Sequence, residues 1–141
     1  MILTRSADYA LRALLHLARC TPGKAERLDA IVESQKVPSA LLSKILQSLV
    51  RGGVVRSQKG YGGGYLIAVD PAELTLRRVV ELVDGPITLF ECLEDQSFCN
   101  FCANCKIRTK LGEIEHTLLQ MLESTTISDC LLDPAEGCPG R

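Results

Sequence analysis

The chain has 141 residues, of which 46% are hydrophobic, and a formal net charge of −1. This apolar content excludes a disordered chain, and the length suits one small domain with an extension. No apolar run approaches the roughly 20 residues of a membrane-spanning helix, so no membrane partner is expected. The N-terminus reaches Asp8 early and shows no small-residue cleavage site, which predicts a cytoplasmic protein without a signal peptide.

The charges are distributed unevenly along the chain. Residues 1–69 contain ten Lys and Arg against four Asp and Glu, a balance of +6. Residues 70–141 contain six against thirteen, a balance of −7. A basic half is typical of nucleic-acid binding, although chance segregation of surface charge explains it equally well.

Three helices are predicted in the first part of the chain. Apolar residues at helical spacing indicate helices over 5–20 and 28–34, and a third that opens at Pro38 and ends at Gly52-Gly53. The third helix has an apolar face and an opposite face of short polar or basic side chains. The candidate DNA-contacting residues on that face are Ser39, Ala40, Ser43, Lys44 and Gln47.

A β hairpin is predicted next, with strands over 54–57 and 65–69 around a glycine-rich turn. Three helices followed by a hairpin is the order of a winged helix–turn–helix, whose third helix enters the major groove while the wing reaches an adjacent groove or backbone. The alternative is a winged helix used only for protein contact. The candidate DNA-contacting residues of the wing are Arg56, Lys59, Tyr61, Gly62 and Gly63.

Two further helices are predicted, over 76–83 and 106–124. The second has apolar residues spaced alternately by four and three, which is the period of a coiled-coil seam and predicts a homodimer. The alternative is an ordinary amphipathic helix that packs on its own domain. The seam consists of Ile107, Leu111, Ile114, Leu118 and Met121.

The seven cysteines stand at positions 20, 92, 99, 102, 105, 130 and 138. Four of them lie between Cys92 and Cys105, and clustered thiols in a reducing cytosol are typical of metal ligands. Their close spacing, without a second distant pair, favours an iron–sulfur cluster over zinc. Cys102 is either a ligand or a spare thiol. We expect Cys20, Cys130 and Cys138 to pack or to lie in the tail, and His16 and His116 to be surface or packed residues.

These elements predict a mainly α fold with a small β wing, namely a winged helix–turn–helix plus a long C-terminal dimerisation helix. The expected organisation is a DNA-binding domain over 1–84, a cysteine-rich cluster-binding loop over 85–105, a dimerisation helix over 106–128 and an irregular tail over 129–141.

Several motifs in this order resemble the Rrf2 family of winged-helix transcription regulators, in its IscR/NsrR-like iron–sulfur type, over roughly residues 1–125. They are Leu3-Thr4-Arg5, Asp8-Tyr9-Ala10-Leu11, Val37-Pro38-Ser39, Lys44-Ile45-Leu46-Gln47-Ser48-Leu49, Gly62-Gly63-Gly64-Tyr65 and the cysteine loop. The resemblance implies a homodimeric regulator, here expected to be a repressor, whose affinity for a double-stranded DNA operator is gated by the cluster. The signal would be nitric oxide, iron or cluster status, or redox state.

The resemblance also implies a ligand set. Three cluster ligands fall by position on Cys92, Cys99 and Cys105, which leaves Cys102 as an addition. IscR-like members add a histidine shortly after the third cysteine, but Lys106 follows here. NsrR-like members take an aspartate from the first helix of the partner subunit, and Asp8 stands at the matching place. From the residues alone, Asp8 is a first-turn acid favoured by the helix dipole. We expect a 4Fe–4S rather than a 2Fe–2S cluster.

Two other classes of function remain as alternatives. One is a winged-helix regulator that uses zinc or bare thiols as its redox sensor, and the other is an iron–sulfur electron carrier. The electron carrier would need neither a basic recognition face nor a glycine wing. The sequence shows no Ser/His/Asp or Cys/His arrangement, no phosphate-binding loop and no paired carboxylates for acid–base work, so we do not expect an enzyme.

Overall fold

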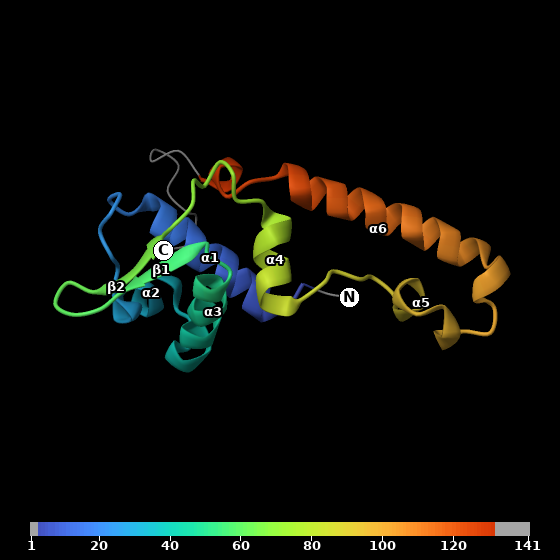
Figure 1. The fold of residues 1–141 in the computed structure, drawn as a ribbon, viewed down its shortest axis with the longest axis horizontal. Helices are drawn as coiled ribbons and strands as arrows, with labels where there is room; N and C mark the ends of the chain where they lie inside the picture. Colours follow the sequence, from blue (N-terminus) through green and yellow to red (C-terminus); the bar gives the residue numbers. More distant parts are fainter. Residues whose placement is uncertain (1–2, 132–141) are drawn as a thin grey trace.

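The computed structural model describes residues 3–131 and is helical apart from one two-stranded antiparallel sheet (Figure 1). The elements in chain order are α1 (Arg5–Arg19), α2 (Leu28–Gln35), α3 (Ser39–Arg51), β1 (Val55–Gln58), β2 (Gly64–Ile67), α4 (Leu76–Asp84), α5 (Glu91–Glu94) and α6 (Lys106–Ser124). This confirms the predicted mainly α fold with a small β wing. Within the described range, no helix has the length and apolar character that a bilayer crossing requires.

The core lies among α1, α2, α3 and α4. Leu14, Ile31, Leu46 and Val79 are at most 1% exposed and pack in one cluster. Their apolar spacing predicted these helices, because each helix needs one buried face. The start of α3 differs by one residue from the prediction: Pro38 has an extended ψ of 128° and precedes the first helical residue.

Three short segments meet side by side at the wing. Strand β1 pairs with β2 in the register Val55↔Ile67. Glu26, in the segment between α1 and α2, exchanges two backbone hydrogen bonds of 2.8 Å with Tyr65 on β2. Gly64 has a φ of +150°, and a Cβ at this position would collide with the carbonyl oxygen of Glu26. Glycine is therefore required where the base of the wing meets this segment.

Helix α6 extends away from the winged-helix body as a long arm, with α5 beside its far part (Figure 1). Its bounds agree with the predicted helix over 106–124. None of its residues is fully buried. Leu119 and Leu122 pack against the small cluster of Ala7, Val80 and Ile87, which fixes one face of the arm to α1 and α4.

The chain after α6 returns to the winged-helix body. Ile127 is 1% exposed, and its N–H donates a 2.8 Å hydrogen bond to the carbonyl of Leu74. Within the expected irregular tail, Asp129 and Cys130 belong to a short 3₁₀ turn over Ser128–Cys130. Residues 132–141, including Cys138, lie outside the described residues.

Candidate functional site

The outer face of α3 presents the residues predicted to contact DNA. Leu42, Ile45 and Leu49 point into the core and are at most 3% exposed. On the opposite side, Ser39, Ala40, Lys44 and Gln47 are exposed and Ser43 is half-buried. The packing of the apolar face thus fixes which side chains face outward, and these are short, polar or cationic.

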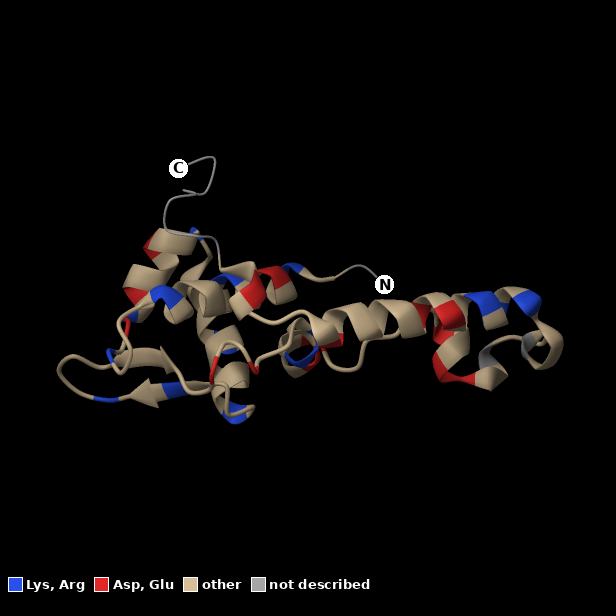
Figure 2. Cartoon of the chain, turned by 90° about the horizontal axis from the view of Figure 1, so that it is seen from above, with Lys and Arg blue, Asp and Glu red and all other residues tan. Residues whose placement is uncertain are grey.

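The wing projects beyond the helices with two cations along it. Arg56 on β1 and Lys59 in the turn are exposed, and Figure 2 shows Lys and Arg residues on this hairpin. Tyr61 stands fully exposed in a turn that otherwise consists of glycine from residue 60 to 64. Because little side-chain bulk covers this turn, its backbone can approach a phosphate closely.

One cation near the wing was not singled out from the sequence. Arg27, which directly precedes α2, lines a hollow of about 720 Å³ together with the glycine turn and Tyr65. Its side chain is 78% exposed and pairs loosely with Asp29 at 3.4 Å. Arg27 therefore extends the basic surface of the wing toward α2. Arg27 lies close to the wing because of the way the chain folds back.

The cysteine segment, residues 85–105, was expected to be a loop. The structure shows short helical turns within it. Cys92 lies on α5, Cys99 follows the 3₁₀ turn Gln96–Phe98, and Cys105 immediately precedes α6. These three thiols are free and half-buried. They do not form a set with all sulfurs within 4.8 Å, the spacing that would suit one metal ion. The side chain of Cys102 lies outside the described part of the structure.

Hydrogen bonds join the cysteine segment to α6 at three points. The Nε of Arg108 donates to the carbonyl oxygen of Cys92 at 2.8 Å. The backbone N–H of Arg108 donates to the Sγ of Cys105 at 3.4 Å. The backbone N–H of Leu89 donates to a carboxylate oxygen of Glu115 at 2.7 Å. A change in the conformation of this segment would therefore act directly on α6.

The turn between Cys92 and Cys99 is fixed by Asp95. Its carboxylate accepts hydrogen bonds of 2.8 Å from the hydroxyl and from the backbone N–H of Ser97. These bonds lower the pKa of Asp95. The carboxylate thus stays ionised at neutral pH and holds the turn that separates the two thiols.

Asp8, the predicted fourth ligand, lies in the first turn of α1. Within one chain it forms an ion pair of 3.0 Å with Arg12, and both side chains are about half exposed. It is not grouped with the thiols of the cysteine segment in the described structure. Asp8 is accessible at the surface. A residue that supplies a ligand to a second chain has to be accessible in this way.

The predicted seam on α6 faces away from the winged-helix body. Ile107, Ile114 and Met121 are 70%, 56% and 63% exposed, which is unusual for large apolar side chains in line. Leu111 and Leu118 lie between them and are half-buried. Leu119 and Leu122, which pack against the winged-helix body, lie outside this row.

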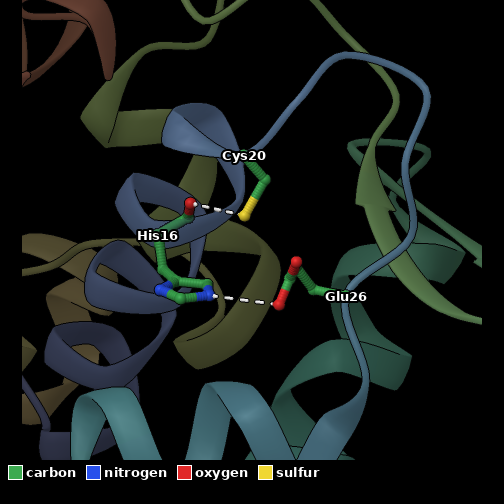
Figure 3. Close-up of side chains that lie close together, drawn as sticks. All are labelled: His16, Cys20 and Glu26. Atoms are coloured by element: carbon green, nitrogen blue, oxygen red, sulfur yellow. Dashed lines mark hydrogen bonds and ion pairs between the residues drawn. The ribbon is translucent and has the colours of Figure 1, made fainter.

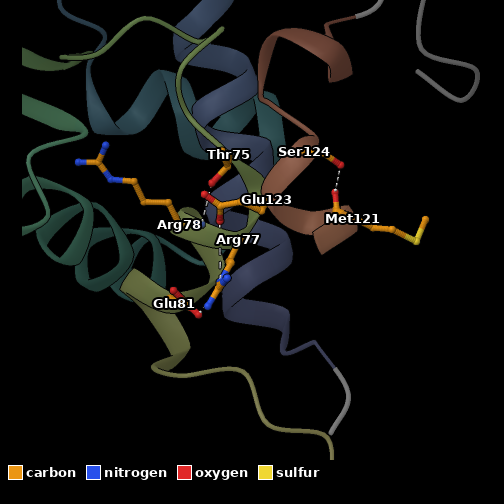
Figure 4. A network of polar contacts seen from close by, with 7 residues as sticks. All are labelled: Thr75, Arg77, Arg78, Glu81, Met121, Glu123 and Ser124. Carbon is orange, nitrogen blue, oxygen red and sulfur yellow. Dashed lines mark hydrogen bonds and ion pairs between the residues drawn. The ribbon is translucent and has the colours of Figure 1, made fainter. Parts of the chain in front are cut away.

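Polar contacts fix the end of α6 to α4 (Figure 4). Arg77 on α4 pairs with Glu81 at 3.0 Å and with Glu123 on α6 at 3.9 Å. Thr75 caps α4 by accepting a 3.2 Å hydrogen bond from the N–H of Arg78. A guanidinium nitrogen of Arg78 donates to the carbonyl of Gly52 at the end of α3, at 3.3 Å. The contacts thus run from α6 through α4 to the end of the candidate recognition helix.

One group of side chains was not predicted from the sequence. His16, Cys20 and Glu26 are half-buried and bring their nitrogen, sulfur and oxygen atoms within 4.8 Å of one another. The spacing of His16 and Cys20, one helical turn apart, was visible in the sequence. Glu26 joins them only because the chain turns back after α1.

Comparison with known sequences gives a family match. The profile of the Rrf2 family, described as an iron-dependent transcriptional regulator, matches residues 3–133. An rrf2-like helix–turn–helix-type regulator from Rhodobacter capsulatus is 33% identical over 138 residues, and 92% of each chain is covered. The regulator NsrR from Bacillus subtilis is 28% identical over 130 residues, which cover 92% of this chain and 89% of NsrR.

Solved structures show the same fold. CymR, the global cysteine regulator of B. subtilis, superposes with a TM-score of 0.77 at 24% identity, covering 93% of this chain and 96% of CymR. IscR from T. potens superposes with a TM-score of 0.78 at 19% identity, covering 99% and 94%. Both similarities concern the fold, and the family profile spans all of the described residues. The protein therefore belongs to the Rrf2 family of transcriptional regulators.

Proposed function

We propose that the protein is a homodimeric repressor whose affinity for its DNA operator is gated by an iron–sulfur cluster held in the cysteine segment. One observation carries this proposal. The thiol-bearing segment lies between α4, which belongs to the winged helix, and α6, which carries a free apolar seam, and it is hydrogen-bonded to α6. A group bound there would sit at the junction of the DNA-reading and dimerising parts.

DNA binding is supported by the surface of α3 and the wing. An exposed row of short polar residues with Lys44 can lie close to base edges, while Arg56 and Lys59 can contact phosphates on either side of the turn. Ser39, Ala40, Ser43, Gln47, Tyr61, Gly62 and Gly63 complete the proposed contact set.

Dimerisation through α6 is supported by its exposed seam. Two copies of α6 packed along Ile107, Leu111, Ile114, Leu118 and Met121 would cover apolar side chains that one chain leaves in water. The same pairing would hold two α3 helices at a fixed separation, as a two-fold symmetric operator requires.

The residues of the cysteine segment fit an iron–sulfur cluster by their chemistry. Cys92, Cys99 and Cys105 are free and half-buried, and thiolates are the ligands that such clusters prefer. A thiolate at Cys105 would face the positive end of the α6 dipole, where the N–H of Arg108 already contacts its sulfur. The ligand sulfur atoms of a cluster of several iron atoms must also lie further apart than those that bind a single metal ion. The family description as iron-dependent supports the same metal.

We propose Asp8 of the second chain as the fourth ligand, with Cys102 as the alternative, and a 4Fe–4S cluster as the cofactor. The bound cluster would supply metal–thiolate bonds that join α5 to the beginning of α6. Arg108 and Glu115 then connect the segment to the arm, and Arg77 connects the arm to α4. A tenfold change in operator affinity requires only about 1.4 kcal/mol.

Anaerobic purification followed by a DNA titration tests the proposal. The protein should absorb visible light and contain iron and sulfide, and an operator selected from a random DNA library should bind at least tenfold differently after chelation of the iron. Equal affinity with and without the cluster would contradict gating. If the protein contains zinc but neither iron nor sulfide, the zinc-sensor alternative would be supported in place of the cluster. Metal-free protein would favour the alternative in which bare thiols are the sensor.

A further inference from the structure

A second group of metal-ligand side chains lies in the DNA-binding part of the chain, apart from the cysteine segment. His16 lies in the last turn of α1, Cys20 directly follows that helix as its C-cap, and both point toward Glu26, which precedes α2 (Figure 3). Their ligand atoms all lie within 4.8 Å of one another, and the side chains of His16 and Glu26 are only 21% and 23% exposed. No other group of three such residues gathers in the described ranges.

The imidazole of His16 is held in the orientation that a metal ligand needs. Its Nδ1 lies 3.1 Å from the hydroxyl oxygen of Ser34, which also accepts a 2.8 Å hydrogen bond from Gln35. When Nδ1 donates to Ser34, the Nε2 atom keeps its lone pair. That Nε2 is buried without a hydrogen-bond partner and lies 3.8 Å from a carboxylate oxygen of Glu26. A cation between this nitrogen and the Glu26 carboxylate would satisfy the lone pair that the nitrogen then carries.

The atoms around Cys20 also favour a bound cation. The Sγ of Cys20 lies within 4.8 Å of a carboxylate oxygen of Glu26. The thiol lies 3.2 Å from the carbonyl oxygen of His16, to which it donates. The sulfur therefore sits among electron-rich atoms, in a negative potential that favours a cation.

We propose that His16, Cys20 and Glu26 form a binding site for a divalent transition-metal ion of the Zn²⁺ or Fe²⁺ type. Imidazole, thiolate and carboxylate are the donors that Zn²⁺ accepts, and three protein ligands leave one position for water or a small ligand. The ion replaces the thiol proton, which passes to solvent. The thiolate and carboxylate charges then neutralise the ion.

The site would connect α1 to the base of the wing. Glu26 is the residue whose backbone exchanges two hydrogen bonds with Tyr65 on β2. An ion that holds the Glu26 carboxylate against α1 therefore restrains the segment on which the wing rests. This restraint is independent of any cluster in the cysteine segment.

Cobalt titration of the full-length chain tests the site. Cys92, Cys99, Cys102 and Cys105 are replaced by Ser, so that the cysteine segment cannot supply thiolates, and Co²⁺ is added without oxygen. We expect thiolate-to-Co²⁺ charge-transfer absorption that saturates at one ion per chain and is displaced by Zn²⁺. A further Cys20→Ser change should abolish this absorption, whereas the matched Cys130→Ser change should leave it intact.

Two additional measurements keep the test decisive if Cys20→Ser perturbs folding. Ser34→Ala leaves all three ligands in place and should weaken Co²⁺ binding by about 10- to 100-fold while the absorption at saturation persists. Zn²⁺ should raise the Tm of the Cys130→Ser protein and not that of a Glu26→Gln variant with native circular dichroism. Absence of the absorption in the parent protein, or its persistence in folded Cys20→Ser protein, would overturn the proposal.

Discussion

Arg108 on α6 donates a hydrogen bond of 2.8 Å from its Nε to the backbone carbonyl of Cys92 on α5. The backbone N–H of the same residue lies 3.4 Å from the sulfur of Cys105. Arg108 thus contacts the backbone of one proposed ligand with its side chain and the thiol of another with its backbone N–H, so a single residue connects the two. Such outer contacts orient metal ligands and slow their dissociation.

Replacement of Arg108 by Ala should therefore make the cluster less stable in air. We expect the visible absorbance of anaerobically purified protein to decay about tenfold faster after exposure to oxygen. Lys110→Ala is the matched control, because Lys110 lies on the same helix, is 73% exposed and pairs with Glu113. Equal decay rates in the two variants would show that Arg108 does not support the ligands.

The elements that the sequence predicts well are those whose signal is local. The apolar spacing along α1, α3 and α6 reflects one apolar face per helix, so periodicity was sufficient. The turns of the cysteine segment could not be predicted because α5 has four residues, about one helical turn. The burial of Ile127 depends on pairing with Leu74, which is distant in sequence and leaves no periodic signal.

The same distinction between local and tertiary signals applies to the candidate sites. The outer face of α3 was predictable because its members share one helix. His16 was expected to be a surface or packed residue, and Cys20 was expected to pack or to lie in the tail. Glu26 reaches them through a turn and through its pairing with Tyr65, and this depends on tertiary structure. Arg27 approaches the wing for the same reason.

The α3 and wing assignment predicts a specific salt dependence of DNA binding. Lys44→Ala and Arg56→Ala should each weaken operator binding, and a residue that neutralises one phosphate should reduce the slope of log K against log salt by about 0.9. Fluorescence anisotropy over a range of salt concentrations measures both quantities. Lys110→Ala, on the distant arm, should leave the slope unchanged. A slope that is flat in the parent protein would contradict phosphate contacts by the wing.

The seam assignment predicts that a charge at its centre separates the dimer. Ile114→Glu places one carboxylate from each chain in an apolar contact, which costs more than the about 1.4 kcal/mol that corresponds to tenfold weaker association. Analytical ultracentrifugation should show a shift toward monomer. Gln120→Glu adds the same charge at an exposed position of α6 outside the seam and should leave the dimer intact. If Ile114→Glu remains as dimeric as Gln120→Glu, the two chains associate through another surface.

The pairing between Glu26 and Tyr65 predicts different effects for two glycine substitutions in the wing. Gly60 and Gly64 both have positive φ values, +90° and +150°, so alanine strains the backbone at either position. Only at Gly64 would the new Cβ collide with the carbonyl of Glu26, which must then give up its two hydrogen bonds to Tyr65. At about 1 kcal/mol for each bond, Gly64→Ala should lower the free energy of unfolding by about 2 kcal/mol more than Gly60→Ala. Urea denaturation of the metal-free proteins measures this difference. Equal losses would mean that the wing does not rest on the segment before α2, because backbone strain alone would then account for both.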